Sequence, residues 1–218
     1  MVLITKIKLL ILLNGINFIE TEEFEHKHGI EEDEEEEHHH HSEKYDAHIW
    51  LDPTISIQMV NNIEKEIAKY DSKNASYYSS NTDTYINELE ALDNDFYNVV
   101  LNGKTKKIAF GGPFAYAYFI ERYGLDFISA YDSCGENGEP SVFKLKEVID
   151  YINNNKLHVI FYKELSSGSI AKTISEETGA EMLEFNSLHT VTDKELEDNV
   201  SYIEIMRKNL DNLKKALN

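Results

Sequence analysis

Histidine is concentrated in one part of this sequence. Seven of the nine histidines lie between residues 26 and 48, and six of these stand in a strongly acidic segment. The six are His26, His28, His38, His39, His40 and His41. Imidazole nitrogen is a ligand suited to Zn²⁺, Cu²⁺ and Ni²⁺, and carboxylate oxygens add negative charge to the same region. The pattern indicates chemistry with transition-metal ions.

The negative charge of the chain is unevenly distributed. Of a net charge of −19, residues 20–46 contribute −11, because they hold 13 acidic residues and two lysines. The remainder is an ordinary, mildly acidic sequence in which 41% of the residues are hydrophobic. Nucleic acid is excluded as a partner, since phosphate binding needs a concentrated basic surface. Metal cations are the partners that such a field attracts.

The acidic, histidine-rich segment at residues 21–45 is predicted to be a disordered loop, because it is too highly charged to be buried. One interpretation is a solvated charge run that binds nothing. The four adjacent histidines also resemble a purification tag, but they are internal. We favour a low-affinity, exchangeable metal-collecting loop, which protonation near the ordinary histidine pKa of about 6.5 would switch off.

The N-terminal residues 1–20 are apolar and strand-like. A leucine-rich run after two lysines at residues 6–13 resembles a weak export signal, although it is short and far from the length that spans a bilayer. The alternative is a buried strand that ends in a turn at Asn14-Gly15. The single cysteine, Cys134, rules out an intramolecular disulfide framework.

Helical patterns begin at Asp52, a suitable N-cap that is followed by Pro53 at the first helical position. Val60, Ile63 and Ile67 then form an apolar stripe at helical spacing. A longer helix is predicted from about residue 75 to residue 100, ending at Asn102-Gly103. Its apolar face comprises Tyr78, Tyr85, Leu89, Leu92 and Phe96.

The rest of the chain alternates between strands and helices. The expected strands are residues 108–110, 127–130, 158–162 and 181–185. The expected helices end near Tyr123-Gly124, run from Ser141 to about Tyr151, and run from Ser169 to Thr178. This alternation predicts an α/β fold with a mostly parallel sheet and helices on both faces.

A last helix is predicted to start at Thr192, where Thr192 and Glu195 match a capping box. Its apolar stripe comprises Leu196, Val200, Ile203, Leu210, Leu213 and Leu217. Ligands on parallel sheets gather at the carboxyl ends of the strands. The segments of Gly111, Asp132, Glu164 and His189 fall there.

Residues Asp46–Pro53 form the sharpest local pattern, Asp-Ala-His-Ile-Trp-Leu-Asp-Pro. His48 is followed by the large side chain of Trp50 and by the capped helix, so its neighbours hold it in place as a metal ligand requires. A lone histidine is more often an ordinary core or surface residue, but the adjacent histidine-rich loop favours a ligand. Cys134 could also be a soft ligand, although an inert loop thiol is the interpretation we favour.

The chain resembles the zinc- and manganese-binding solute-binding proteins of ABC importers, known as the cluster A-I family. Asp-X-His-X-Trp-Leu-Asp-Pro is the central motif of that family, and a histidine-rich loop before it is typical of the zinc-selective members. The other matching segments are residues 118–125, 139–141, 170–174, 178–180, Tyr202 and 209–210.

The resemblance implies two α/β lobes joined by a long rigid helix, with the metal bound in the cleft between them. The implied divisions are a remnant of an N-terminal lobe at 1–20, the histidine-rich loop at 21–45, the central motif and following helix at 46–74, the linking helix at 75–102 and the C-terminal parallel-sheet lobe at 103–218. Family members carry many more residues before the loop, so the chain resembles a truncated product.

The resemblance also implies metal ligands. His48 matches the ligand histidine of the central motif, and Glu164 lies nearest to the family's acidic ligand. A second family histidine should fall near Gly111-Gly112-Pro113, where this chain has none. His189 could replace it, or could be a surface histidine in the loop before a helix.

The implied function is capture of Zn²⁺, with Mn²⁺ as the alternative metal, and its delivery to an ABC transporter permease in the membrane. The expected protein is an extracytoplasmic monomer, either a cell-surface lipoprotein or periplasmic, and not an enzyme. A stand-alone metal buffer or metallochaperone that uses only the loop is the alternative. A metal-dependent hydrolase using Glu139, Glu164 and His189 is a third hypothesis, but no catalytic motif supports it.

Overall fold

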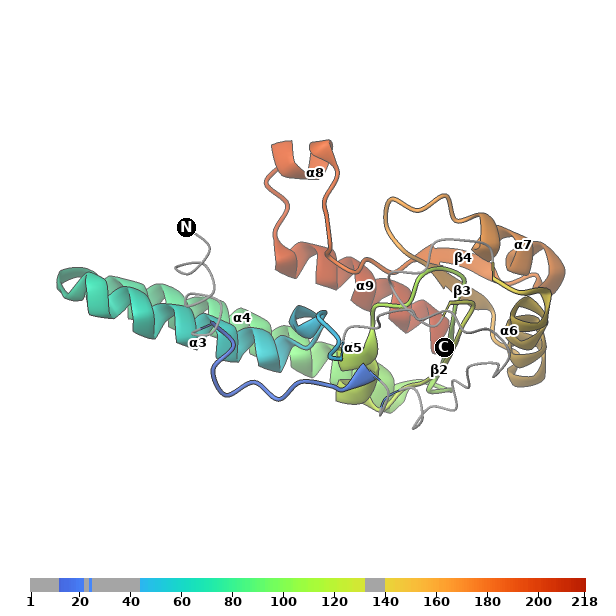
Figure 1. The fold of residues 1–218 in the computed structure, drawn as a ribbon, viewed down its shortest axis with the longest axis horizontal. Helices are drawn as coiled ribbons and strands as arrows, with labels where there is room; N and C mark the ends of the chain where they lie inside the picture. Colours follow the sequence, from blue (N-terminus) through green and yellow to red (C-terminus); the bar gives the residue numbers. More distant parts are fainter. Residues whose placement is uncertain (1–11, 22–23, 25–43, 132–139) are drawn as a thin grey trace.

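The computed structural model describes residues 12–21, 24, 44–131 and 140–218 (Figure 1). The histidine-rich loop, Asp132, Cys134 and Glu139 lie outside these residues. In chain order the elements are η1 Ile49–Leu51, α3 Pro53–Tyr70, η2 Ser72–Asn74, α4 Ala75–Asn102, β1 Lys107–Phe110, α5 Ala117–Tyr123, β2 Asp126–Ser129, α6 Val142–Asn155, β3 Val159–Tyr162, α7 Ser169–Thr178, β4 Glu181–Glu184, α8 Asp193–Glu197 and α9 Tyr202–Ala216.

The four strands form one parallel sheet in the order β2-β1-β3-β4. Helices α6 and α7 cover one face, because α6 contacts β1 and β2 while α7 contacts β3 and β4. Helix α9 packs on the other face, against β3 and β4. The predicted α/β architecture with helices on both faces is therefore confirmed.

The side chains of the strands alternate between two apolar cores, as the two-residue period of a strand requires. Phe110 and Phe161 point into the core that the sheet shares with α4, α5 and α9. Ala109 and Ile160 point into the core under α6 and α7. Both faces of the sheet are therefore covered, and the inner strand β3 carries apolar or aromatic side chains throughout.

Helices α3 and α4 form a pair that extends away from the sheet (Figure 1). The expected long helix is observed as α4, and its buried residues are Leu89, Leu92, Phe96 and Val100, all in its C-terminal half. That half also contacts α9. The sheet and the helices packed on it, residues 103–218, are called the sheet lobe below. The candidate site lies where the α3–α4 pair meets this lobe.

The expectation of a strand in the N-terminal residues is wrong for residues 12–20, while residues 1–11, with most of the possible export signal, lie outside the described residues. Described residues 12–20 form a short helical turn and coil, with one isolated antiparallel bridge between Glu20 and Tyr45, rather than a strand. The turn at Asn14-Gly15 is present, and Gly15 adopts a positive φ of 77°. No neighbouring strand pairs with residues 12–18 in the described part of the chain, so apolar character there serves packing around Ile16 instead.

The predicted single C-terminal helix is also wrong. The capping box of Thr192 and Glu195 exists, but it starts the five-residue helix α8, which projects from the body (Figure 1). Asn199 then takes a left-handed φ of 53°, which a continuous helix cannot accommodate. A second capping box, from Ser201 to Glu204, starts α9. Leu196 is consequently exposed rather than part of the core stripe.

Smaller differences concern the ends of elements. Strand β2 begins one residue earlier than expected, and α6 continues four residues beyond Tyr151 to Asn155, where Lys156 closes it in the left-handed conformation. Among the described helices, none combines the length and the apolar character needed to cross a lipid bilayer.

Candidate metal centre

His48 is held by the carboxylate of Asp46. Oδ1 of Asp46 accepts hydrogen bonds from the backbone N–H of His48 at 2.6 Å and from its ring Nδ1 at 2.9 Å. A carboxylate only accepts, so the ring proton sits on Nδ1 and the lone pair on Nε2. This carboxylate–histidine pairing is the arrangement that orients metal-binding imidazoles.

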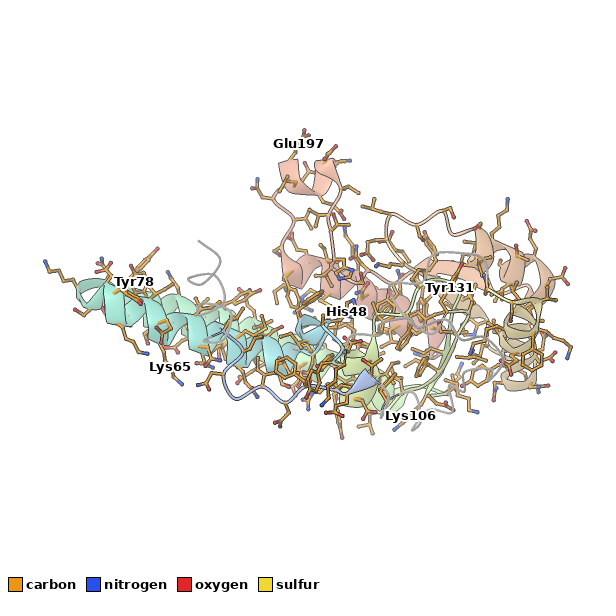
Figure 2. The ribbon with its side chains drawn as sticks, viewed as in Figure 1. His48, Lys65, Tyr78, Lys106, Tyr131 and Glu197 are labelled. Carbon is orange, nitrogen blue, oxygen red and sulfur yellow. The ribbon has the colours of Figure 1, made fainter. Side chains whose placement is uncertain are left out.

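The residues that follow His48 fix its position in the fold. Ile49 and Leu51 are buried in the short helix η1, and the Asp52 side chain then caps α3 by accepting from the Thr54 N–H at 2.7 Å. The Tyr118 hydroxyl donates to the backbone carbonyl of Asp46 at 3.1 Å. His48 itself is only 7% exposed, and Figure 2 shows it between the α3–α4 pair and the sheet lobe.

Trp50 connects the His48 segment to the sheet lobe. Its indole N–H donates to the backbone carbonyl of Ser187, after β4, at 2.9 Å. The Tyr202 hydroxyl at the start of α9 donates to the carbonyl of Trp50 at 2.7 Å. These two hydrogen bonds confirm the prediction that Trp50 anchors the histidine segment.

His189 lies beside His48. The centroids of the two imidazole rings are 4.6 Å apart, and the Trp50 ring lies 5.5 Å from each of them. The surrounding protein lowers the pKa of His189 chiefly by desolvation, and His48 and Lys163 lower it further. Since His189 is an exposed residue, desolvation acts on part of the ring only. The lowered pKa favours the neutral imidazole, the form that binds metals.

Glu164 is buried in the same region. Its Oε2 accepts from the backbone N–H of Ser187 at 2.7 Å, and its Oε1 accepts from the Ser187 hydroxyl at 2.6 Å. Because Ser187 is itself fully buried, these bonds tie the segment after β3 to the segment after β4. The negative charge of Glu164 also raises the pKa of His189, opposing the larger effects that lower it.

The structure brings His48 and His189 into contact, and Glu164 lies near enough to affect the pKa of His189. Among the residues that the structure describes, no group of three or more histidine, cysteine or acidic side chains is arranged to hold a metal ion. Of the proposed ligands, the two imidazoles are in direct contact, with ring centroids 4.6 Å apart. The six loop histidines, and with them the loop prediction, lie outside the described residues.

The segment Gly111–Pro113, where a family histidine was expected, has room for a side chain at Gly112 but not at Gly111. A Cβ atom added to Gly111 would lie 2.6 Å from the Cα of Ala171, closer than real side chains approach. A Cβ at Gly112 would meet the backbone nitrogen and the Cβ of Lys163 at ordinary distances of 3.6 and 4.0 Å. Helix α7 therefore excludes every side chain at Gly111.

The sequence analysis did not identify two residues that lie beside the site, Lys163 and Ser187. The Lys163 ammonium lies 3.2 Å from Nδ1 of His189, and Ser187 holds both oxygens of Glu164. Neither belongs to a residue type that attracts attention as a metal ligand. The signal for the Asp46 contact was present, because Asp side chains commonly bond a backbone N–H two residues on.

Solved structures with the same fold identify the class of protein. The metal-dependent lipoprotein YcdH from Bacillus subtilis aligns over 94% of this chain and 69% of its own, with a TM-score of 0.74 and 27% identity. The Zn(II)-bound ZnuA-like domain of Streptococcus pneumoniae AdcA aligns over 79% of this chain and 64% of its own, with a TM-score of 0.67 and 28% identity. The fold is that of the metal-binding solute-binding proteins.

The chain belongs to the family described as zinc-uptake complex component A, periplasmic (ZnuA), whose model matches residues 11–216. It is 36% identical over 203 residues to the high-affinity zinc uptake system protein ZnuA of Bacillus subtilis. That alignment covers 93% of this chain and 61% of the relative, so the chain spans about three-fifths of the relative's length. The resemblance found in the sequence is thereby confirmed, and the family description is of a transport component rather than an enzyme.

Proposed function

We propose that this chain forms part of a zinc-capturing solute-binding protein, which passes Zn²⁺ to the permease of an ABC importer. The observation that carries the proposal is the 4.6 Å approach of the His48 and His189 rings. His48 belongs to the segment before α3, and His189 to the loop after β4, so the pair bridges the helical and sheet regions. Nitrogen donors from separate elements are what a capture site needs, because each can move relative to the other when the ion enters or leaves.

Zn²⁺ is the cargo that this donor set fits best. His48 would bind through Nε2, since Nδ1 donates to Asp46. His189 supplies the second imidazole, and Glu164 is the proposed carboxylate donor, because each of its oxygens retains a lone pair beyond the bond to Ser187. Zn²⁺ takes four ligands, mostly nitrogen and sulfur, whereas Mn²⁺, the alternative, prefers oxygen.

The histidine-rich loop would collect ions for this site. Its six histidines are the proposed weak and exchangeable donors, and its negative charge raises the local concentration of cations. We propose an extracytoplasmic location and a monomer that docks on the permease, with α4 linking the N-terminal remnant to the C-terminal lobe. Relatives named as a lipoprotein and as a zinc uptake protein support the location and the partner.

Zinc titration of four full-length proteins tests the proposal. His48→Ala and His189→Ala each remove one donor and should weaken tight binding by about 100-fold or more, because even a residue that only supports a ligand is worth 10- to 100-fold. His158→Ala is the matched control. The His158 ring is hydrogen-bonded through Nε2 to the backbone carbonyl of Lys215, and His158 is not one of the proposed ligands. Calorimetry with a competing chelator gives the affinities.

Deleting residues 25–43 separates the loop from the site. We expect the deletion to remove weak binding events and to leave the tight event that depends on His48. If the deletion abolishes zinc binding while His48→Ala binds zinc like the wild type, the protein is instead a metal buffer that uses the loop alone. Equal tight affinities for the wild type, His48→Ala and His189→Ala would disprove the site.

A further inference from the structure

Two oppositely charged residues follow strand β3 and contact different partners. The Glu164 carboxylate accepts two hydrogen bonds from Ser187, at 2.7 and 2.6 Å. The Lys163 ammonium lies 3.2 Å from Nδ1 of His189. A positive charge is therefore held directly against a proposed ligand for a divalent cation, where simple electrostatics would place a negative one.

The Lys163 contact determines where the His189 proton lies. An ammonium group has three N–H donors and no acceptor, so Nδ1 of His189 must accept the hydrogen bond. A neutral imidazole carries one proton, which then sits on Nε2. Neither ring nitrogen then has a lone pair available for a metal ion, because the Nδ1 lone pair accepts the hydrogen bond from Lys163 and Nε2 carries the proton.

A metal ion can bind His189 only if Lys163 moves away. Binding at Nδ1 uses the lone pair that accepts the ammonium. Binding at Nε2 requires the proton to move to Nδ1, and a protonated Nδ1 donates and cannot accept from Lys163. Both routes break the same hydrogen bond, and the like charges of the ammonium and the metal add repulsion.

We infer that Lys163 sets the affinity of the metal site by competing with the incoming cation for His189. The inference rests on the proposed function. The four-carbon stem of lysine is flexible, so the ammonium can move aside when the ion binds and return when it leaves. Lys163 thus weakens capture and assists release, which a protein that must hand its cargo to another protein requires.

Substitution of Lys163 in the full chain tests the inference. Lys163→Met keeps the length of the side chain and removes the charge, so zinc affinity should rise about 10-fold, the equivalent of one hydrogen bond to a charged group. Lys163→Arg keeps a cation and should bind zinc like the wild type. Lys172→Met is the matched control for net charge, since the Lys172 side chain on α7 is 69% exposed, and its affinity should not change.

Two further measurements distinguish competition from a general effect on structure. In the zinc-free wild type, nitrogen NMR of the histidine rings should show His189 with its proton on Nε2, and Lys163→Met should alter that signal. In a His189→Ala background, Lys163→Met should no longer increase zinc affinity, because the nitrogen that is competed for is gone. Independent, additive effects of the two substitutions would overturn the inference.

The outcomes separate this inference from the proposed function. If Lys163→Met binds zinc no more tightly than the wild type while His48→Ala loses tight binding, the competition is refuted and the metal site stands. If tight binding in both the wild type and Lys163→Met is independent of His48 and His189, the site itself is refuted and the inference falls with it.

Discussion

The sheet lobe and the α3–α4 pair bury their apolar residues to very different degrees. In the lobe, Phe161 is fully buried, and its ring lies 5.6 Å from that of Phe110 and 5.0 Å from that of Phe185. In α3 the only buried residue is Pro53, and Ile63 and Ile67 are 46% and 41% exposed. The lobe has a closed core of its own, whereas α3 depends mainly on its contact with α4.

The proposed metal centre lies where these two regions meet. His48 precedes α3, and His189 follows β4 of the lobe. The Trp50 indole bond to Ser187 joins the two segments directly. The geometry of the site therefore depends on contacts between a well-buried region and a less buried one. Substitutions in the two regions should lower the free energy of unfolding by unequal amounts.

The largest expected contrast compares one substitution in each region. Phe161→Ala removes a fully buried ring from the lobe and should lower the free energy of unfolding by about 3–5 kcal/mol. Ile63→Ala in α3 removes a half-exposed side chain and should cost about 1 kcal/mol or less. Urea denaturation followed by circular dichroism measures both values. Comparable losses would show that the exposed face of α3 is covered in solution.

A second contrast tests how tightly the lobe packs at the edge of the sheet where His189 lies. Gly111→Ala forces a Cβ to within 2.6 Å of the Ala171 backbone, so β1 or α7 must shift. The expected loss is about 1–3 kcal/mol, as for other overpacked cores. Gly112→Ala makes ordinary contacts of 3.6 and 4.0 Å with Lys163 and should change stability by less than about 1 kcal/mol. Thermal unfolding of the two variants measures the difference, and equal melting temperatures would contradict it.

Much of the lobe was predictable because local and global signals agree there. Each strand has apolar residues at its centre and is followed along the chain by a helix, and the parallel-sheet rule then placed Glu164 and His189 at one edge. The His48 prediction depended on local sequence: the motif from Asp46 to Pro53, the adjacent histidine-rich loop and the family resemblance that the motif carries. These features need no knowledge of distant contacts.

The errors arise where the outcome depends on backbone conformation or on distant partners. The capping box at Thr192 was identified correctly, but the left-handed Asn199 that separates α8 from α9 has no strong sequence signal. The contact of Lys163 with His189 joins residues 26 positions apart, in the segments that follow the neighbouring strands β3 and β4, and no periodicity predicts it. The exclusion of side chains at Gly111 likewise depends on Ala171 in α7.

The smallest expected effect concerns Asp52, the residue at which the lobe-facing segment passes into α3. Its Oδ1 accepts from the N–H and the hydroxyl of Thr54, both at 2.7 Å. Burial raises the pKa of this carboxyl, although the Thr54 bonds and the Arg122 charge act in the opposite direction. Asp52 is thus a favourable helix cap that carries a partly unfavourable charge.

The raised pKa gives the Asp52 effect a definite pH dependence. The folded protein holds the Asp52 proton more tightly than the unfolded chain, so its contribution to stability is full below the unfolded value of about 3.9. That contribution is lost as the pH rises through the higher, folded value. Asp52→Asn can still cap α3 but cannot ionise, so it should lose less stability than the wild type over this interval.

Urea denaturation across a pH series tests the Asp52 prediction, with Asp52→Ala as the control that lacks any cap. Asp52→Ala should cost about 1 kcal/mol at low pH, because the Thr54 N–H loses its acceptor, and should cost less as the pH rises through the folded pKa of Asp52. If Asp52→Asn is less stable than the wild type at neutral pH, attraction between the carboxylate and Arg122, 3.9 Å away, outweighs the cost of burial. The α3–α4 pair would then be held to the lobe by charge as well as by the hydrogen bond of Trp50, and the contrast between the two regions would be smaller than their apolar burial indicates.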